Sequence, residues 1–415
     1  MNPETKNKHK LINDPVHGFV TVPTDFIFDL IEHPYFQRLR RIKQLGLTHY
    51  VYPGATHTRF QHTIGALHLM TLAIESIMSK GIAISAEEQE AVLIAILLHD
   101  IGHGPFSHAL EKTIISGVTH ELISHMLMQE LNDEYQSKLD MAIAIYNNLY
   151  TKKFLHQLVA SQLDMDRLDY IKRDSFFTGV TEGTIGTDRL IKMLNVHNDG
   201  LVIEKKGIYS VEKFLIARRL MYWQVYFHKT VIASENLLVR MLQRAKFLAD
   251  KQIPVYCTPS LSFFLYDKID SRNINERAKE VIRYFIRLDD SDIIVSAKEW
   301  QNCNDKVLAT LSYNLLNRVL PAVIITDQSA SEKIKQEIRN NIQSEYGIRN
   351  DEINFLISEG EISNSAFSGR NDMIKIQMTK EDIRDISEVS DILNDPYLQK
   401  SEKKHFLCYP KECGV

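Results

Sequence analysis

Histidine and aspartate residues gather in the first half of the sequence, in a pattern suited to holding a metal ion. His57-Thr-Arg59-Phe-Gln-His62 is followed by His99-Asp100-Ile-Gly-His103-Gly-Pro-Phe-Ser-His108, and then by His120. Neutral imidazole offers a nitrogen and aspartate an oxygen to a borderline divalent ion, while water fills the remaining positions. An open site of this kind is what metal-dependent hydrolysis requires.

The pair His99-Asp100 is the centre of this pattern. His99 follows the apolar run 91–98, so its imidazole is expected inside the protein, where a polar group needs a partner. Adjacent residues on a helix point about 100° apart, so both side chains reach one ion only over the edge of the helix. Gly102 and Gly104-Pro105 are expected to end that helix.

Two pairs of residues three positions apart add further chemistry. His108 and Glu111 would share one helix face, which lets the carboxylate orient or polarise the imidazole for general acid/base work. Arg59 and His62 are spaced in the same way and would combine a phosphate clamp with a metal ligand.

Two stripes with spacing i, i+4, i+8 lie downstream. The first consists of Asp166, Tyr170 and Asp174, and a single helix face would present them as a metal ligand and substrate contacts. The second is cationic and aromatic, as a nucleotide polyphosphate requires, and consists of Arg218, Tyr222 and Tyr226.

Each stripe alone would more often be a packing face or a row of solvated salt bridges. The combination changes that interpretation. His62, His99-Asp100 and Asp166 fall on three predicted helices, two of them along apolar runs, where unpaired charges would be costly without an ion. We therefore favour a metal site over a purely structural cluster.

The elements that must position these residues are mainly helical. Apolar residues recur at three- and four-residue spacing from residue 25 to about 250, with one short β-hairpin predicted from 200–204 and 206–210. Beyond residue 318, strand-like runs at 319–325, 353–357 and 373–378 surround a charged helix at 331–346. We predict a helical catalytic core over residues 1–250 and a smaller helical and α/β region over 251–415, which would supply oligomer contacts.

Length and composition fit a large globular enzyme. The chain has 415 residues, of which 44% are hydrophobic and 25% charged, and its net charge of -4 argues against binding nucleic acid through a globally basic surface. The first ten residues are polar, and no segment approaches the ~20 apolar residues of a membrane span. We expect a cytoplasmic protein without membrane contact.

Four blocks of sequence resemble one enzyme family. They are Asp14-Pro-Val-His-Gly18, Phe36-Gln-Arg-Leu-Arg-Arg-Ile-Lys-Gln-Leu-Gly46, Tyr52-Pro-Gly-Ala-Thr-His-Thr-Arg-Phe-Gln-His62 and the block 99–108. Their order over residues 12–248 resembles the HD-domain phosphohydrolases, and within them the deoxynucleoside triphosphate (dNTP) triphosphohydrolases. Leu288-Asp-Asp-Ser-Asp-Ile also resembles bacterial members.

The resemblance implies an HD-domain helical core and hydrolysis of a dNTP to deoxynucleoside and inorganic triphosphate, by water attack at the α-phosphorus. The metal, which could be Mn, Fe, Mg, Zn or Ni, would be held by His62, His99, Asp100 and Asp166. Arg59, Arg167 and Arg218 would bind the phosphates. His108 and Glu111 would act at the leaving oxygen or the attacking water, and His103 and His120 would line the site. Gln44, Tyr170 and Asp174 would contact the deoxyribose.

Some positions depart from the vertebrate branch of that family. Arg167 stands in place of a lysine, Glu111 of an aspartate and Tyr222 of a histidine. The first two keep the chemistry, whereas Tyr222 changes the surroundings of the base and sugar. Family members form dimers or tetramers, and some need a nucleotide activator, so a homodimer or homotetramer is the expectation here.

Two other functions stay open at this point. An HD phosphatase or phosphodiesterase would act on monophosphates or cyclic nucleotides and would be indifferent to Arg218→Ala. A dNTP-binding sensor with weak catalysis would keep the metal ligands and bind dNTPs without turning them over.

Overall fold

The computed structural model describes residues 10–106, 109, 113–115, 117–364, 373–393 and 402–414. His108 and Glu111 lie outside the described residues, so the acid/base role assigned to them remains a prediction.

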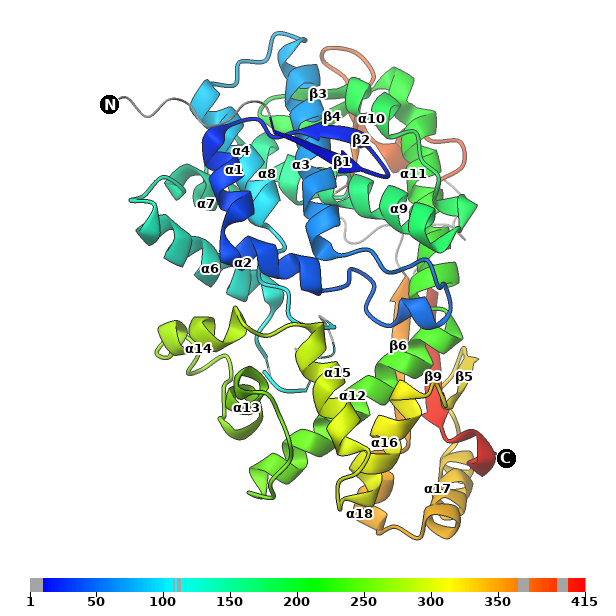
Figure 1. The fold of residues 1–415 in the computed structure, drawn as a ribbon. Coiled ribbons are helices and arrows are strands. Elements are labelled where there is room, and N and C mark those ends of the chain that lie inside the picture. The colour runs from blue at the N-terminus through cyan, green and yellow to red at the C-terminus, as the bar shows by residue number, and fades with distance from the viewer. Residues whose placement is uncertain are drawn as a thin grey trace.

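The N-terminal part is mainly helical, which confirms the predicted fold class (Figure 1). Its strands are β1 (Leu11–Asp14), β2 (Gly18–Thr21), β3 (Leu194–His197) and β4 (Gly200–Glu204). Its helices are α1 (Asp25–Glu32), α2 (Pro34–Gln37), α3 (Arg59–Met78), α4 (Ala86–Leu98), α6 (His120–Glu134), α7 (Asp140–Tyr146), α8 (Lys153–Val159), α9 (Met165–Thr178), α10 (Thr187–Met193) and α11 (Ile208–Met221).

Helices α3 and α4 lie at the centre of this part. The side chain of Ser85 accepts a hydrogen bond from the Glu88 amide, and Glu88 reaches back to the Ser85 amide, so a capping box fixes where α4 begins. Every residue from Ala91 to Leu98 is buried, and the helix ends with His99 as its C-cap. The apolar run therefore delivers His99 into the interior, as its sequence position predicts.

The predicted hairpin exists, but with a different partner strand. β4 pairs antiparallel with β3, which precedes it, whereas Ile208 begins α11. The turn uses Asn198 and Asp199, whose φ angles of 46° and 63° suit the tight turns that join twisted strands. The Asn-Asp-Gly sequence was the turn signal, and the prediction of residues 206–210 as the second strand was wrong.

The C-terminal part surrounds one long helix, α12 (Lys229–Asp250), and a sheet with strand order β5-β9-β6 (Figure 1). The other elements are α13 (Pro259–Tyr266), α14 (Ala278–Phe285), α15 (Asp290–Trp300), α16 (Lys306–Leu316), β5 (Ala322–Thr326), α17 (Glu332–Tyr346), α18 (Asn350–Ile353), β6 (Ser358–Asn364), β7 (Lys375–Gln377), β8 (Ile383–Asp385), α19 (Ile386–Val389) and β9 (Glu402–Tyr409). The charged helix is confirmed as α17. The strand predicted at 353–357 begins later, at Ser358, because residues 350–353 form α18.

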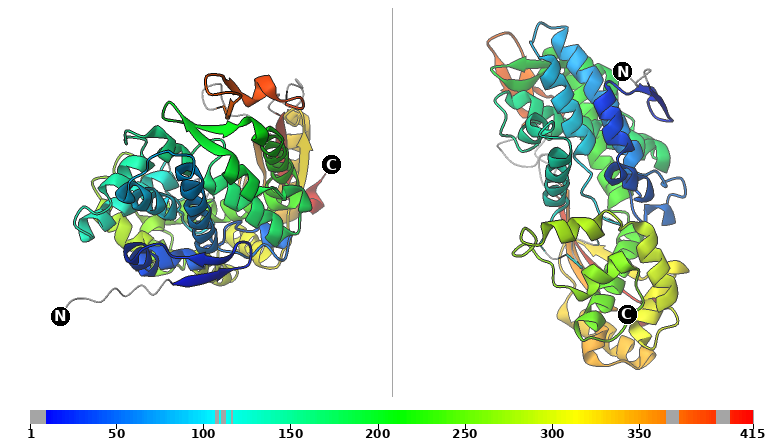
Figure 2. Two further views of the ribbon diagram at one scale, coloured as in Figure 1. Left: turned by 90° about the horizontal axis from the view of Figure 1, so that it is seen from above. Right: turned by 60° about the vertical axis from the view of Figure 1, so that its left-hand side comes forward.

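A late segment returns to the N-terminal part. β7 pairs parallel with β4, through Ile203 and Ile376, and β8 pairs with β7, so the sheet order is β3-β4-β7-β8. Two lobes with a narrower region between them are visible in the right-hand view of Figure 2. The domain boundary at residue 250 stays a prediction. Helix α12, which ends at this residue, lies in the lower lobe (Figure 1), whereas β7 and β8, which follow it, pair with β4 in the upper lobe.

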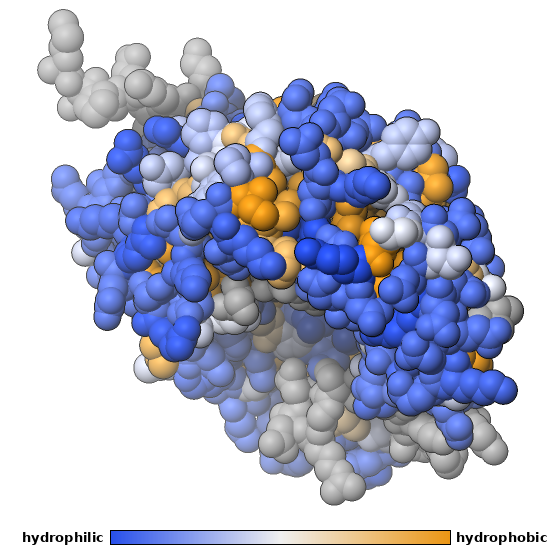
Figure 3. Space-filling view, turned by 90° about the horizontal axis from the view of Figure 1, so that it is seen from below, coloured by the Kyte–Doolittle hydropathy of each residue, from blue (hydrophilic) through white to orange (hydrophobic). Residues whose placement is uncertain are grey.

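The surface seen from below is mostly hydrophilic, with apolar side chains gathered in separate patches (Figure 3). Among the described residues, no helix combines the length and apolar character needed to cross a bilayer.

Candidate active site

Three helices bring three of the predicted metal ligands together. His62 comes from the first turn of α3, His99 from the end of α4 and Asp166 from the first turn of α9, and their ligand atoms lie within 4.8 Å of one another. Asp166 Oδ1 lies 3.1 Å from His62 Nε2 and 3.5 Å from His99 Nε2. Two nitrogens and a carboxylate oxygen therefore face one shared point.

The polar atoms of this cluster fit a divalent ion. Among the described residues, the buried Nε2 atoms of His62 and His99 have no partner in hydrogen-bond geometry, although Asp166 Oδ1 lies close to both. A buried polar atom without a partner is costly, and two such nitrogens beside one carboxylate are typical ligands of a transition metal. The donor set fits a divalent metal and does not decide which one.

Without an ion, two neighbouring carboxylates increase the proton affinity of His62. Burial lowers the pKa of His62, but the carboxylates of Asp166 and Asp169, which lie 3.1 Å and 2.8 Å from its two ring nitrogens, outweigh burial and raise this pKa to about 10. The pKa of Asp166 lies below its ordinary value because the two imidazoles stabilise its charged form. A bound metal would replace the proton on His62 and use the same carboxylates to balance its charge.

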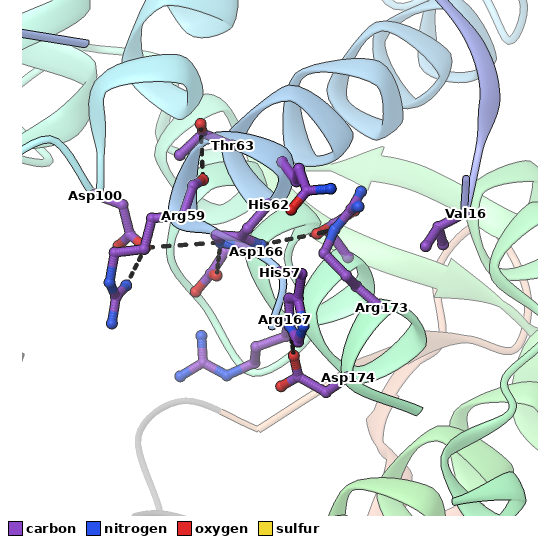
Figure 4. Close-up of polar contacts among 12 residues, drawn as sticks. Val16, His57, Arg59, His62, Thr63, Asp100, Asp166, Arg167, Arg173 and Asp174 are labelled. Carbon is purple, nitrogen blue, oxygen red and sulfur yellow. Dashed lines mark hydrogen bonds and ion pairs between the residues drawn. The ribbon is translucent and has the colours of Figure 1, made fainter. Parts of the chain in front are cut away.

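Behind His62 lies a buried network of charged side chains. His62 Nδ1 lies 2.8 Å from Asp169 Oδ2, so Asp169 orients the ring. Arg173 Nε donates to the same carboxylate at 2.8 Å, and Arg173 Nη1 donates to Asp14 Oδ2 at 2.8 Å. His17 Nε2 lies 2.7 Å from Asp169 Oδ1. Figure 4 shows Arg173 on one side of His62 and Arg59 with Asp100 on the other.

Gly65 makes room for this network. A Cβ at position 65 would lie 2.0 Å from Asp169 Oδ1 and 2.2 Å from Arg173 Nη2, far closer than atoms can approach. Gly65 is about one helical turn after His62, so at this turn the side chains of α9 pack directly against the backbone of α3. Only glycine allows the carboxylate to reach the imidazole.

His99 is oriented by the backbone rather than by a carboxylate. Its Nδ1 lies 2.6 Å from the carbonyl oxygen of Ile96. Ser124 on α6 donates from its hydroxyl to the His99 carbonyl oxygen at 2.8 Å and accepts from the Gly102 amide at 2.9 Å. The second imidazole is therefore fixed by the geometry of the helix end.

Asp100 lies at the edge of the cluster and is occupied by other partners. Its Oδ1 is 3.3 Å from His99 Nε2 and 3.2 Å from His103 Nε2. Its Oδ2 accepts a 2.6 Å hydrogen bond from Arg59 Nη1 and lies 3.8 Å from His62 Nε2. Burial is outweighed by His99, His103 and Arg59, so the pKa of Asp100 is well below its usual range. Its role as a metal ligand, and that of Arg59 as a phosphate clamp, stay predictions.

His103 and His120 lie together, and their place in the active site stays a prediction. Their rings are stacked, with centroids 3.8 Å apart and planes at 17°. Burial and the nearby charge of Arg59 hold the pKa of His103 well below its ordinary value, so this imidazole is neutral at physiological pH.

The cationic and aromatic stripe lies beside α9. Tyr222 and Tyr226 are in contact, with ring centroids 5.0 Å apart, and Tyr170 lies 6.4 Å from Tyr226. Burial raises the pKa of Tyr170 well above its ordinary value, while the nearby charges of Arg218 and Arg167 oppose the shift. The structure thus gathers two of the predicted phosphate clamps around three tyrosines.

These clamps already have protein partners. Arg167 pairs with the buried Asp164, which also caps α9, and Arg218 Nη1 donates to Gln162 Oε1 at 2.9 Å. Burial raises the pKa of Asp164 to about 6. A phosphate at this place would compete with Asp164 and Gln162 for these cations.

Two of the predicted sugar contacts, Asp174 and Gln44, are each hydrogen-bonded to His57. Asp174 accepts from Tyr226 Oη at 2.7 Å, and its other oxygen lies 2.7 Å from His57 Nε2. The Gln44 amide donates to the His57 carbonyl oxygen at 2.9 Å, and the buried Gln44 Oε1 has no hydrogen-bond partner. The contact of Gln44 with the deoxyribose stays a prediction.

Several residues of the site had no assigned role in the sequence analysis. They are Asp14, His17, His57, Asp164, Asp169 and Arg173. Asp169 and Arg173 are spaced i, i+4 on α9, which could have identified them as a pair, and Gly65 at three residues from His62 was a further signal.

Comparisons with known proteins agree with this geometry. Residues 59–174 match the model of the HD domain, and residues 185–253 match that of an HD-associated region. A solved structure of a phosphohydrolase from Bacteroides thetaiotaomicron has a TM-score of 0.93 and 50% identity, over 96% of this chain and 99% of that one.

Two curated relatives add to this result. The protein YwfO of Bacillus subtilis is 33% identical over 325 residues, which cover 76% of this chain and 71% of that protein. A protein of Dictyostelium discoideum named deoxynucleoside triphosphate triphosphohydrolase SAMHD1 homolog is 34% identical over 253 residues, which cover 56% of this chain and 49% of the relative. The match thus spans about half the length of that relative.

Proposed function

The chain belongs to the HD-domain phosphohydrolases, a family of metal-dependent hydrolases, and we propose that it hydrolyses dNTPs to deoxynucleoside and inorganic triphosphate. The observation that carries the proposal is the metal cluster of His62, His99 and Asp166, with two arginines and three tyrosines beside it on α9, on α11 and on the π-helical turn Tyr222–Tyr226 that follows α11. The relatives named as dNTP triphosphohydrolases supply the substrate class.

In this proposal water adds to the α-phosphorus, and the bond from that phosphorus to the 5′ oxygen breaks. The deoxynucleoside leaves with a proton on its 5′ oxygen, and the three phosphates leave together. His62, His99 and Asp166, with Asp100 at the edge, would hold the metal. When bound, a divalent ion supplies Lewis-acid polarisation of a phosphoryl oxygen.

The protein side chains supply the remaining electrostatics. Arg167 and Arg218 would balance the charge of the triphosphate, with Arg59 as a third cation beside Asp100. Neutral His103, stacked on His120, offers a nitrogen that can accept or donate a proton near the reacting oxygens. Tyr170, Tyr222 and Tyr226 would pack against base and sugar, and Gln44 and Asp174 would contact the sugar.

Product analysis tests the proposal. Each dNTP, alone and all four together, is incubated with the protein and Mn or Mg, and the products are separated. We expect deoxynucleoside and triphosphate in equal amounts from the wild type and none from Asp166→Ala. Release of nucleoside monophosphate or of single phosphates would instead support the phosphatase or phosphodiesterase alternative, and tight binding without products the sensor.

Arg218→Ala separates triphosphate substrates from smaller ones. Loss of a charged hydrogen bond costs about 1.5–3 kcal/mol, so KM for a dNTP should rise by about 10- to 100-fold. An enzyme acting on monophosphates or cyclic nucleotides would be indifferent to this substitution.

The remaining expectations accompany this proposal. We expect a homodimer or homotetramer, a response to a nucleotide activator and a cytoplasmic location. All four cysteines are free thiols, which agrees with a reducing compartment. Light scattering with and without dNTPs measures the oligomeric state and whether nucleotides change it.

A further inference from the structure

Asp290 in the C-terminal part holds two chain segments of the candidate site. It is the first residue of α15 and is 8% exposed. Its Oδ2 accepts from the Lys43 amide at 3.0 Å, and its Oδ1 accepts from the Phe106 amide at 3.1 Å. One carboxylate therefore joins residues 43 and 106, which are more than 60 positions apart in the chain.

The first of these segments runs beside the start of α3. Lys43 pairs with Thr58 in an antiparallel bridge, the Gln44 amide donates to the His57 carbonyl oxygen, and the Arg59 amide donates to the Ile42 carbonyl oxygen at 3.0 Å. A shift of Lys43 would therefore move the backbone of the residues on both sides of Thr58.

The second segment, residues 101–106, carries His103. Phe106 has a φ of 48°, a left-handed conformation that a bulky residue adopts only under constraint. The hydrogen bond from its amide to Asp290 supplies such a constraint.

Arg38 also joins the segment 101–106 to the residues around Asp290, but as a hydrogen-bond donor. Its guanidinium is fully buried, and Nη2 donates to the carbonyl oxygens of Ile101 and His103, both at 2.8 Å. Nη1 donates to the Leu288 carbonyl oxygen at 3.1 Å. Asp290 thus accepts from an amide of the segment 101–106, and Arg38 donates to two carbonyls of the same segment. Arg38 also ties this segment to Leu288, two residues before Asp290.

From these contacts we propose that Asp290 is a positioning residue for the hydrolytic reaction, through which the C-terminal part sets the relative placement of residues 42–44 and 101–106. This inference rests on the proposed function, because its kinetic readout needs a turned-over dNTP. It also has a structural readout that does not depend on the substrate.

The test compares Asp290→Asn and Asp290→Ala with Ser291→Ala, an exposed neighbour on the same helix turn. Asparagine has nearly the same shape, but it places an NH₂ group against one of the two amides, and alanine removes both acceptors. Hydrogen–deuterium exchange is measured on the full chain without substrate, together with metal content, kcat and KM.

We expect faster exchange in peptides containing Lys43 and Phe106 for both Asp290 variants, with Ser291→Ala unchanged. Metal content and KM should match the wild type, while kcat falls by about 10- to 100-fold, because small misplacements of reacting groups have effects of that size. Asp290→Ala should show the larger change in both exchange and kcat.

Other results would overturn the inference. Faster exchange confined to α15 would mean that Asp290 only stabilises the start of its own helix, and uniformly faster exchange would mean a general loss of stability. Faster exchange at both segments with unchanged kcat would equally contradict a positioning role. If the wild type turns over no dNTP, the proposed function fails, and the exchange pattern still decides whether Asp290 holds the two segments.

Discussion

The two imidazoles of the metal cluster are oriented by different means. His62 is held by Asp169, which is in turn fixed by Arg173 and His17 in a fully buried network. His99 is held by the carbonyl oxygen of Ile96, one turn back on its own helix. One ligand thus depends on side chains from several elements, and the other mainly on the backbone.

This difference determines where the site is sensitive to substitution. A carboxylate that orients a ligating histidine commonly accounts for 10- to 100-fold in metal affinity. Asp169 is also a buried negative charge that is paired with Arg173. A backbone carbonyl cannot be removed by substitution, so changes near His99 act only indirectly. We therefore expect the His62 side to respond strongly and the His99 side weakly.

Asp169→Asn should have the largest effect. It removes a buried negative charge from beside Arg173 and places an NH₂ group near His62, so metal affinity should fall by about 10- to 100-fold. Breaking a buried ion pair should also lower the free energy of unfolding by about 3–5 kcal/mol. Metal titration and urea unfolding measure both quantities. Asp188→Asn, exposed on α10, is the control, and unchanged metal affinity would refute the orienting role.

The pH dependence of the metal-free protein tests the same side. The pKa of His62 is raised from 6.5 to about 10, so the protonated ring contributes stability that is complete below pH 6.5 and is lost as pH rises towards 10. The free energy of unfolding in EDTA should decrease over this window, by at most about 1.4 kcal/mol per pH unit from this group. His62→Gln should remove that part of the slope. Equal slopes in both proteins would contradict the assignment.

Gly65→Ala should act through packing. The added methyl group would overlap Asp169 and Arg173, and overpacking of this kind costs about 1–3 kcal/mol. Metal affinity should fall as well, because His62 loses its fixed partner. Gly186→Ala, which has open space at the added Cβ, is the control for the change from glycine. A loss of stability shared by both variants would mean that the network is not involved.

Ser124→Ala should have the smallest effect on metal affinity. It removes the hydrogen bonds to the His99 carbonyl oxygen and the Gly102 amide, which should cost about 1–3 kcal/mol. The bond from His99 Nδ1 to Ile96 remains, so metal affinity should change by less than about tenfold. A loss as large as that of Asp169→Asn would remove the contrast between the two sides.

Sequence spacing predicted which helices meet at the site better than it predicted which face of each helix is buried. His62, His99 and Asp166 come together as expected, because each has a clear position in a helical pattern. Spacing could pair Asp169 with Arg173, but it could not show that Asp169, rather than another aspartate of α9, faces His62. Its burial depends on the place where α9 approaches α3 at Gly65, which is a property of tertiary packing.

The same limit applies to the β-structure. The turn at Asn198-Asp199 is a local signal and was available in the sequence, whereas the partner strand was assigned to the wrong side of β4. The pairing of β4 with β7 has no local signal at all, since the two strands are far apart in the chain. The contacts of Asp290 belong to the same class, because they join segments that only the complete fold brings together.

The parallel pairing of β4 with β7 also has a consequence for synthesis. A ribosome delivers Ile203 long before its partner Ile376, so β4 waits at the edge of its sheet while the whole of α12 to β6 emerges. An open strand edge of this kind is a place where another nascent chain can pair. Completion of the upper lobe is therefore a late event, and a pause in translation before β7 would lengthen the time during which this edge is open.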